Sequence, residues 1–313
     1  MTAAPERRPV ELGRLRTEMR NERTTELDTM PVAELLTVMN AEDRSVAVAI
    51  GAAIAQIAAA VELITTSLHS GGRLIYLGAG TSGRIALLDA VECPPTFSTR
   101  PDQVMVLLAG GHPAFTTAAE GAEDSPARAI ADVDRAGVDE RDTIVGIAAS
   151  GRTPYVLSGL DRARERGAAT VSIACNRDAE CTAHADVGIE IDTGPEVLTG
   201  STRLKAGTAQ KLVCNMLSTA AMVQLGKTYQ NLMIDLRPTN GKLLDRARRI
   251  VATAADVDEQ TAASTLESAG NRPKIATVML AAGVDPVEAA RQLAAADGSV
   301  RRAIDLARKP LGR

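Results

Sequence analysis

The sequence predicts an α/β protein built on a doubly wound, five-stranded parallel sheet with helices before and after it. Short apolar runs alternate with helical segments, and glycine-rich turns stand where an apolar run passes into a helix. The expected strands are residues 73–78, 104–109, 143–148, 170–175 and 187–192. The segments 83–91, 115–137 and 154–167 between them have the composition of helices.

The segments on either side of the sheet define the expected domains: an N-terminal arm and helix (1–45), a domain that contains the sheet (46–240) and a small helical domain (241–313). Residues 1–30 are charged and lack periodicity, which predicts an extended arm. We expect a short helix from Pro31 to about Asn40 and a long one from about Ala41 to Leu68. Glycines divide the tail into helices, which we place at 240–252, 256–266, 272–282, 285–295 and 298–307.

Composition excludes several functions. The chain has 313 residues, no Trp, three Tyr and two Phe, so stacking on bases or sugars is not expected and ligand recognition should be polar. The net charge of −4 argues against binding nucleic acid. The apolar stretch 46–61 is too short to span a membrane and has helical spacing, which indicates a buried helix. The charged N-terminus is unlike a signal peptide, and the four cysteines form no CxxC pair, so we expect reduced thiols in the cytoplasm.

The turn Gly78-Ala-Gly-Thr-Ser-Gly83 follows the first expected strand and opens a helix. Its glycines allow close approach of a ligand, the helix N-terminus offers free N–H groups, and Thr81 and Ser82 add hydroxyls. The spacing also fits a dinucleotide site, but the next strand ends in Gly110-Gly-His112 without the carboxylate that would hold a ribose. A phosphate monoester is therefore favoured, and the alternative is a turn that only packs helix on strand.

A second hydroxyl-rich turn follows the third expected strand, with Ser150, Gly151 and Thr153 ahead of Pro154. By itself such a turn is more often a helix cap. Ligands of doubly wound sheets lie beyond the carboxyl ends of the strands, however, so the two turns could share one phosphate. A third segment, 194–211, places Arg203, Lys205 and Lys211 at the start of a helix with Ser201 or Thr202 as its N-cap. These cations indicate an anionic ligand or, equally, a solvated basic face.

Two carboxylates stand in unusual surroundings. Glu92 precedes Cys93-Pro-Pro95, a stiff and partly apolar segment that favours a raised pKa and acid chemistry. Glu123 follows the second strand, but the residues alone favour Glu123 and Asp124 as ordinary first-turn acids before Pro126. The three histidines, His69, His112 and His184, form no ligand pair, so no metal is expected, although His112 at a strand end could line the pocket.

Five motifs in the same order resemble those of the N-acetylmuramic acid 6-phosphate etherase family, which belongs to the sugar isomerase (SIS) superfamily and is related to the glucokinase regulatory protein. They are Gly78–Arg84, Glu92–Phe97, Glu120–Asp124, Ala149–Pro154 and Glu196–Lys211. The resemblance extends from about Thr17 to Leu243, and the helical tail is similar to a ubiquitin-associated-like domain. It implies a flavodoxin-like SIS sheet and a homodimer.

The resemblance also implies an activity: cleavage of the D-lactyl ether at C3 of N-acetylmuramic acid 6-phosphate, giving N-acetylglucosamine 6-phosphate and D-lactate in cell-wall recycling. Elimination is followed by addition of water, with Glu92 as the acid and Glu123 as the base. No cofactor is implied. The implied substrate contacts are Gly80, Thr81, Ser82, Ser150, Gly151, Thr153, Glu196, Ser201 and Lys205.

The residues alone leave two other functions open. An aldose–ketose isomerase of sugar phosphates would also begin with removal of the C2 proton, but it would have no use for a second acid. A non-catalytic sugar-phosphate sensor would need neither carboxylate.

Overall fold

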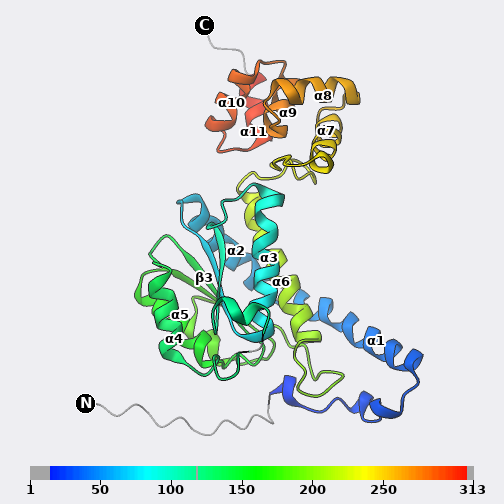
Figure 1. The fold of residues 1–313 in the computed structure, drawn as a ribbon, viewed down its shortest axis with the longest axis vertical. Coiled ribbons are helices and arrows are strands. Elements are labelled where there is room, and N and C mark those ends of the chain that lie inside the picture. Colours follow the sequence, from blue (N-terminus) through cyan, green and yellow to red (C-terminus); the bar gives the residue numbers. More distant parts are fainter. Residues whose placement is uncertain (1–14, 118, 309–313) are drawn as a thin grey trace. The chain divides into compact units, whose positions relative to one another are not determined.

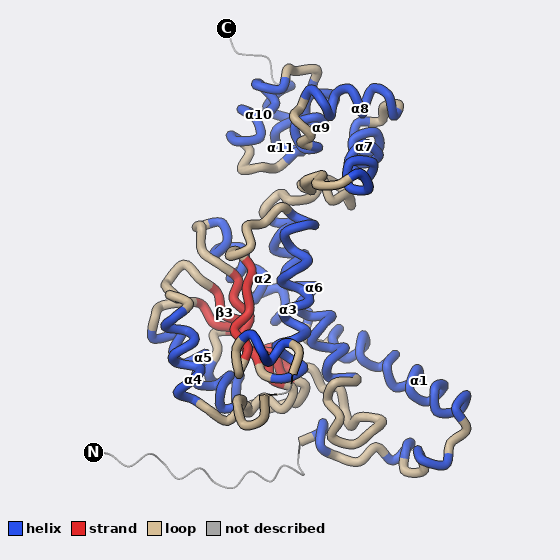
Figure 2. The backbone as a smooth tube through the Cα atoms, in the orientation of Figure 1, coloured by secondary structure: helices blue, strands red, loops and turns tan. Residues whose placement is uncertain are grey.

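A five-stranded parallel sheet lies at the centre of the fold. The computed structural model describes residues 15–117 and 119–308. The strand order is β2-β1-β3-β4-β5, and Figure 2 shows the strands gathered into one layer. Their bounds are β1 Leu74–Gly78, β2 Val104–Leu108, β3 Thr143–Ala148, β4 Ala169–Ala174 and β5 Val187–Glu190. All five predicted strands are confirmed, with ends that differ by at most two residues.

The strand order explains why ligand chemistry belongs at one edge of this sheet. β1 and β3 are buried along their whole length, as expected of continuous apolar runs in central strands. The chain first runs from β1 to β2 on one side and then returns to β3 on the other side of β1. This reversal is the topological switch point of a doubly wound sheet, where the loops after two neighbouring strands part and leave a crevice. The loops after β1 and β3 are the two hydroxyl-rich turns.

Helices α4 (Pro126–Arg135) and α5 (Pro154–Glu165) pack against each other, and α5 packs on β3 (Figure 1). The predicted single helix over 115–137 is wrong in its first half. A 3₁₀ turn covers His112–Phe115, and α4 begins only at Pro126. Gly111 and Gly121 both have positive φ, which ends any helix there, and the side chain of Ser125 caps α4.

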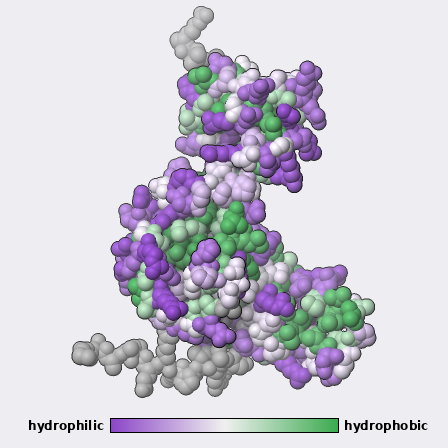
Figure 3. Space-filling view, viewed as in Figure 1, coloured by the Kyte–Doolittle hydropathy of each residue, from purple (hydrophilic) through white to green (hydrophobic). Residues whose placement is uncertain are grey.

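The first two helices are α1 (Val32–Gly51) and α2 (Ile54–His69), so the predicted break near residue 40 is wrong. The chain bends at Ala52-Ala53 instead, where N–H groups bond to carbonyls three residues back. No single helix in the described residues, α1 included, is long and apolar enough to cross a membrane. Helices α1 and α2 taken together have the length and composition for a span, but they are bent relative to each other by 64°. Val32, Leu36 and Val48 are exposed, and Figure 3 shows apolar surface over α1.

The segment expected to be an extended arm is folded where the structure describes it, from residue 15 on; residues 1–14 lie outside the described residues. It forms 3₁₀ turns at Arg16–Glu18, Glu22–Thr24 and Leu27–Thr29. Thr17 N–H donates to Asn176 Oδ1 (3.3 Å), and Asn176 Nδ2 donates back to Thr17 Oγ1 (3.0 Å). Asn176 follows β4, so this arm packs against the carboxyl edge of the sheet. Thr17 and Asn176 are 159 positions apart, so no local sequence pattern indicates that this segment is folded.

Helix α3 (Gly80–Phe97) is longer than predicted, because it continues through Pro94 and Pro95. Buried Ala90, Cys93 and Phe97 continue its apolar face at helical spacing, so packing overrides the helix-breaking effect of the prolines. The other long helix, α6 (Lys205–Gln224), contacts the later part of α3 through the buried Asp89. The carboxylate of Asp89 accepts hydrogen bonds from Asn215 Nδ2 (2.6 Å) and Ser218 Oγ (2.9 Å).

The last five helices enclose a hydrophobic core of their own, with members from Ile234 to Ile304. They are α7 Gly241–Ala255, α8 Glu259–Ser268, α9 Pro273–Ala282, α10 Pro286–Ala295 and α11 Val300–Arg308, and all five were predicted. The chain forms two compact units. The first holds residues up to Ala60, Ile75–Leu87 and Val106–Cys214; the second holds Val61–Leu74, Leu88–Met105 and the residues from Asn215 on.

Candidate functional site

The first hydroxyl-rich turn connects β1 to α3. Gly80, the first residue of α3, has φ +53°, and Thr81 is half-buried while Ser82 is buried. A Cβ on Gly83 would lie 2.2 Å from Leu108 Cδ1, so a side chain there would collide with β2. The glycines therefore pack helix on strand, as the alternative interpretation proposed, and they also bring the hydroxyls of Thr81 and Ser82 to the start of the helix.

The second turn connects β3 to α5 and is held by its own backbone. Ser150 Oγ accepts a hydrogen bond from Arg152 N–H (3.2 Å). Gly151 has φ +72°, and a Cβ there would lie 2.5 Å from Ala179 Cβ. Thr153 occupies the N-cap position of α5, but its side chain makes no capping hydrogen bond. The interpretation of this turn as a simple hydroxyl cap is therefore wrong for Thr153, whose hydroxyl is not used by the helix.

Glu123 is attached to the second turn. Its backbone carbonyl accepts a hydrogen bond from Tyr155 N–H (3.0 Å) in the first turn of α5, and its side chain is exposed. The first turn of α4 contains no acid, and Ser125 caps that helix. The alternative of Glu123 as a first-turn acid is therefore wrong. Glu123 lies in a loop that is joined by a backbone hydrogen bond to the start of α5.

Helix α6 begins later than predicted, and a carboxylate caps it. Ser201 and Thr202 lie in turns before the helix, so their assignment as the N-cap is wrong. The buried Glu196 takes this role, because its two carboxylate oxygens accept hydrogen bonds from the N–H groups of Lys205 and Ala206, both at 2.9 Å. Burial raises the pKa of Glu196, although both N–H groups oppose that shift.

Lys205 is the cation of this segment that the fold buries. Its Nζ lies 2.7 Å from Glu42 Oε2, with side-chain exposures of 4% and 9%. Arg23 Nη1 contacts the other oxygen of Glu42 at 2.8 Å. Burial alone would raise the pKa of Glu42, but Lys205 and Arg23 outweigh it and the pKa is lowered. Arg203 and Lys211 are exposed, as the basic-face interpretation expected.

The first compact unit brings most of the predicted residues to one edge of the sheet. The start of α6 lies beside the first turn, since a Cβ on Gly207 would be 3.7 Å from Thr81 Cγ2. The first and second turns follow the neighbouring strands β1 and β3. Glu123 is bonded to the helix that follows the second turn. The first unit therefore holds two hydroxyl-bearing turns, one carboxylate and the capped start of α6.

Glu92 belongs to the second compact unit and is not in this set. It is exposed on the later part of α3, whereas its neighbour Cys93 is buried. Burial raises the pKa of Cys93 to about 12, so this thiol stays protonated. Glu92 is therefore the solvent-exposed acid of its motif.

Some polar groups near the turns were not predicted. Arg84 in α3 donates from Nε to Phe115 O (3.3 Å) and holds the loop after β2. Arg152 Nε and Thr193 Oγ1 are buried and have no hydrogen-bond partner among the described residues. Unsatisfied buried groups of this kind call for a ligand or water.

The side chain of His112 is exposed and meets the Phe115 ring edge-on, with the ring centres 5.8 Å apart. Across the described residues, no group of three or more His, Cys, Asp or Glu could hold a metal ion.

Two family models and a solved structure match parts of the chain. Residues 56–164 match the glucokinase regulatory protein N-terminal SIS domain, and residues 125–220 match the SIS domain. A solved putative phosphosugar isomerase of Bacteroides fragilis covers 62% of this chain and 91% of its own at 21% identity, with a TM-score of 0.49.

Curated relatives match nearly the whole chain. The N-acetylmuramic acid 6-phosphate etherase of Mycolicibacterium smegmatis is 65% identical over 295 residues, which cover 94% of this chain and 99% of the relative. The enzyme of that name from a Geobacillus species is 53% identical, with coverage of 94% and 99%. At this identity and coverage, the chain belongs to the N-acetylmuramic acid 6-phosphate etherase family.

Proposed function

We propose that this protein cleaves the D-lactyl ether of N-acetylmuramic acid 6-phosphate to give N-acetylglucosamine 6-phosphate and D-lactate. Relatives of that name match 94% of the chain. The observation that carries the proposal is the pair of hydroxyl-bearing turns after β1 and β3, with Glu123 bonded beside the second. Such an arrangement suits a substrate that has a phosphate at one end and an acidic C–H bond at the other.

In this proposal the phosphate binds the two turns. Thr81 and Ser82 donate hydrogen bonds from the start of α3, where N–H groups and the helix dipole favour an anion. Ser150, Gly151 and Thr153 donate from the second turn. Glu196 acts indirectly, because both of its oxygens are used by the first turn of α6. Lys205 is paired with Glu42 and supports the same segment.

The proposed chemistry is a lyase-type elimination followed by hydration, with no cofactor. In the open-chain aldehyde the carbonyl acidifies the C2 proton, which Glu123 removes. The C2–H electron pair forms a C2=C3 double bond, the C3–O pair leaves with the lactyl oxygen, and Glu92 protonates that oxygen. Water then adds at C3 and gives up a proton to Glu92. Glu123 is exposed, so its proton exchanges with solvent before it protonates C2. Each carboxyl has then both gained and lost one proton, so the enzyme returns to its starting state.

We further propose that the protein works as a cytoplasmic homodimer. The exposed apolar residues of α1, Val32, Leu36 and Val48, form a surface that a second copy could cover.

The experiment that tests the proposed function compares Glu92→Gln and Glu123→Gln in purified protein. Both variants should lose D-lactate release and still bind N-acetylmuramic acid 6-phosphate, because the amide keeps the shape of the carboxyl and removes its proton chemistry. Glu140→Gln is the matched control, an exposed acid in the turn before β3 at the opposite edge of the sheet. Normal turnover in either variant would exclude that residue from the mechanism, and an isomerised sugar phosphate that keeps its lactyl group would indicate an isomerase.

A further inference from the structure

The second compact unit contains a cavity of about 730 Å³, which we call the C-terminal cavity. It is bounded by the segment 227–238, by the start of α9 and by α10, and Ser98 contributes to its wall. Ser98 Oγ donates a hydrogen bond to the backbone carbonyl of Asp235, which ties these segments together. A volume of this size is in the range that binds a small metabolite.

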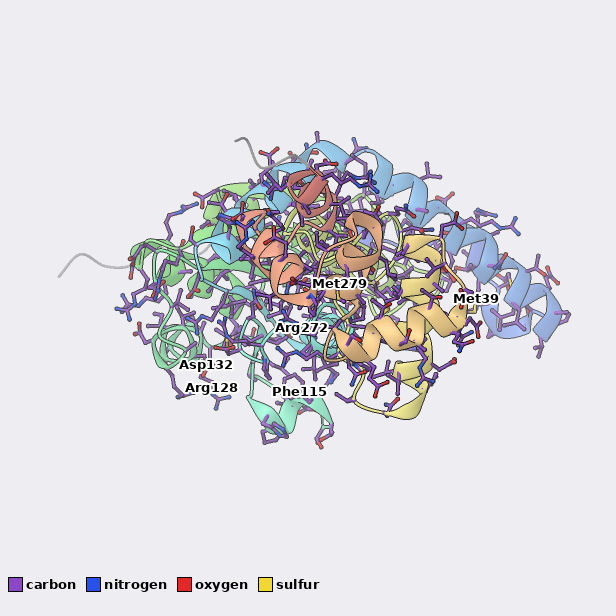
Figure 4. All side chains as sticks on the ribbon, turned by 90° about the horizontal axis from the view of Figure 1, so that it is seen from above. Met39, Phe115, Arg128, Asp132, Arg272 and Met279 are labelled. Carbon is purple, nitrogen blue, oxygen red and sulfur yellow. The ribbon has the colours of Figure 1, made fainter. Side chains whose placement is uncertain are left out.

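The charges lining the cavity are unbalanced. Lys227 Nζ and Lys274 Nζ both contact the carboxylate of Asp235, at 2.9 and 3.0 Å. Arg237 and Arg272 line the same cavity with exposed side chains, and neither forms an ion pair with a described residue. Four cations therefore face one carboxylate. Figure 4 labels Arg272, the residue just before α9.

Lys274 shows that part of this excess positive charge is shielded from solvent. Its side chain is only 12% exposed, and burial lowers its pKa despite Asp235. Its ammonium shares a single counter-ion with Lys227. A buried cation that shares its counter-ion with another cation is stabilised when a second anion binds beside it. Leu236 and Leu293 provide apolar wall beside the charged groups, against which carbon atoms can pack.

We propose that the C-terminal cavity binds a small phosphate monoester and is a second anion site, made only of residues of the second unit. The guanidiniums of Arg237 and Arg272, which form no ion pair with a described residue, supply forked donors that match phosphate oxygens, and Lys274 supplies a point charge. The carbon body of the ligand packs against the apolar wall. This site is independent of the sugar-phosphate site proposed above and would exist even if the reaction were a different one.

The test is hydrogen–deuterium exchange of the full chain with inorganic phosphate, with glucose 6-phosphate, or with glucose as the uncharged control. Phosphate and glucose 6-phosphate should slow exchange in peptides covering 234–238 and 270–276, and glucose should not. Glucose 6-phosphate should bind more tightly than inorganic phosphate, because it also covers the apolar wall. Peptides are read separately, so protection of the turns at 78–83 and 148–154 does not obscure the result.

The Arg237→Ala/Arg272→Ala variant should raise the dissociation constant of glucose 6-phosphate at the C-terminal cavity about tenfold or more, since it removes both guanidinium groups. Protection at 78–83 and D-lactate release should stay as in the parent protein. Arg249→Ala, which removes an exposed cation of α7 outside the cavity, is the matched control and should bind as the parent does. The proposal is overturned if 270–276 gains no protection, or if the double variant keeps it. Binding of an acidic peptide without binding of phosphate would also overturn it.

Discussion

The buried ion pair between Lys205 and Glu42 gives a quantitative prediction for Lys205→Met. The two side chains are 4% and 9% exposed, and the charged atoms lie 2.7 Å apart. Removing one partner of a buried pair costs about 3–5 kcal/mol, because the other charge is left without compensation. Arg23 still contacts Glu42 in the variant, but its side chain is 65% exposed. We therefore expect a loss of about 2–4 kcal/mol in the free energy of unfolding.

The pH dependence of this loss has a definite sign. The pKa of Glu42 is lowered in the folded protein below its ordinary value of 4.5. A lowered carboxyl pKa contributes stability that is present above pH 4.5 and is lost as the pH falls through the folded pKa. Since Lys205 causes much of that lowering, the difference between parent and variant should be full at neutral pH and should shrink in acid.

The assay is urea unfolding followed by circular dichroism at neutral and acid pH. Arg249→Ala is the matched control, because it breaks an exposed pair with Asp245, with side chains 65% and 59% exposed. Such i,i+4 pairs contribute about 0.3–0.5 kcal/mol. The reasoning is refuted if Lys205→Met costs no more than Arg249→Ala, or if its cost is the same at both pH values.

Three further predictions concern the turns and the start of α6. Ser82→Ala and Ser150→Ala should each raise KM for N-acetylmuramic acid 6-phosphate with little change in kcat, as steady-state kinetics would show; unchanged KM in both would place the phosphate elsewhere. Gly151→Ala should destabilise the fold by about 2–4 kcal/mol in urea unfolding, since it adds a collision with Ala179 to the left-handed backbone. The control Gly137→Ala also has a positive φ (+59°), with open space around an added Cβ, and should cost only about 1–2 kcal/mol; equal losses would contradict the collision. Glu196→Gln should cost about 1–3 kcal/mol by replacing one acceptor at the start of α6, and an unchanged unfolding midpoint would contradict its capping role.

The parts of the fold that sequence predicted are those coded by neighbouring residues. The central strands are continuous apolar runs, and glycines separate helices of the tail, as with Gly283 after α9 and Gly298 before α11. Such signals lie within a few residues of the element they define. The two hydroxyl-rich turns belong to the same class, because each is a short motif at the end of a strand.

The failures involve partners far apart in the chain. Residues 15–30 have no period of their own, and their turns are held by Asn176 and Val197. Glu196 caps α6 from nine residues away, and Glu42 pairs with Lys205 across 163 residues. Neither pairing leaves a local signal. The substrate contacts of Glu196 and Lys205 that the resemblance implies stay predictions. Catalytic roles for Glu92 and Glu123 remain predictions.

The measurement that tests the central claim most directly follows isotopes from labelled water. Purified protein and N-acetylmuramic acid 6-phosphate are incubated in D₂O enriched in ¹⁸O, and both products are examined by mass spectrometry and NMR. Elimination and hydration should leave deuterium at C2 and ¹⁸O at C3 of N-acetylglucosamine 6-phosphate, with no ¹⁸O in the hydroxyl of D-lactate. Retention of the C2 hydrogen, or ¹⁸O in the lactate hydroxyl, would contradict the account.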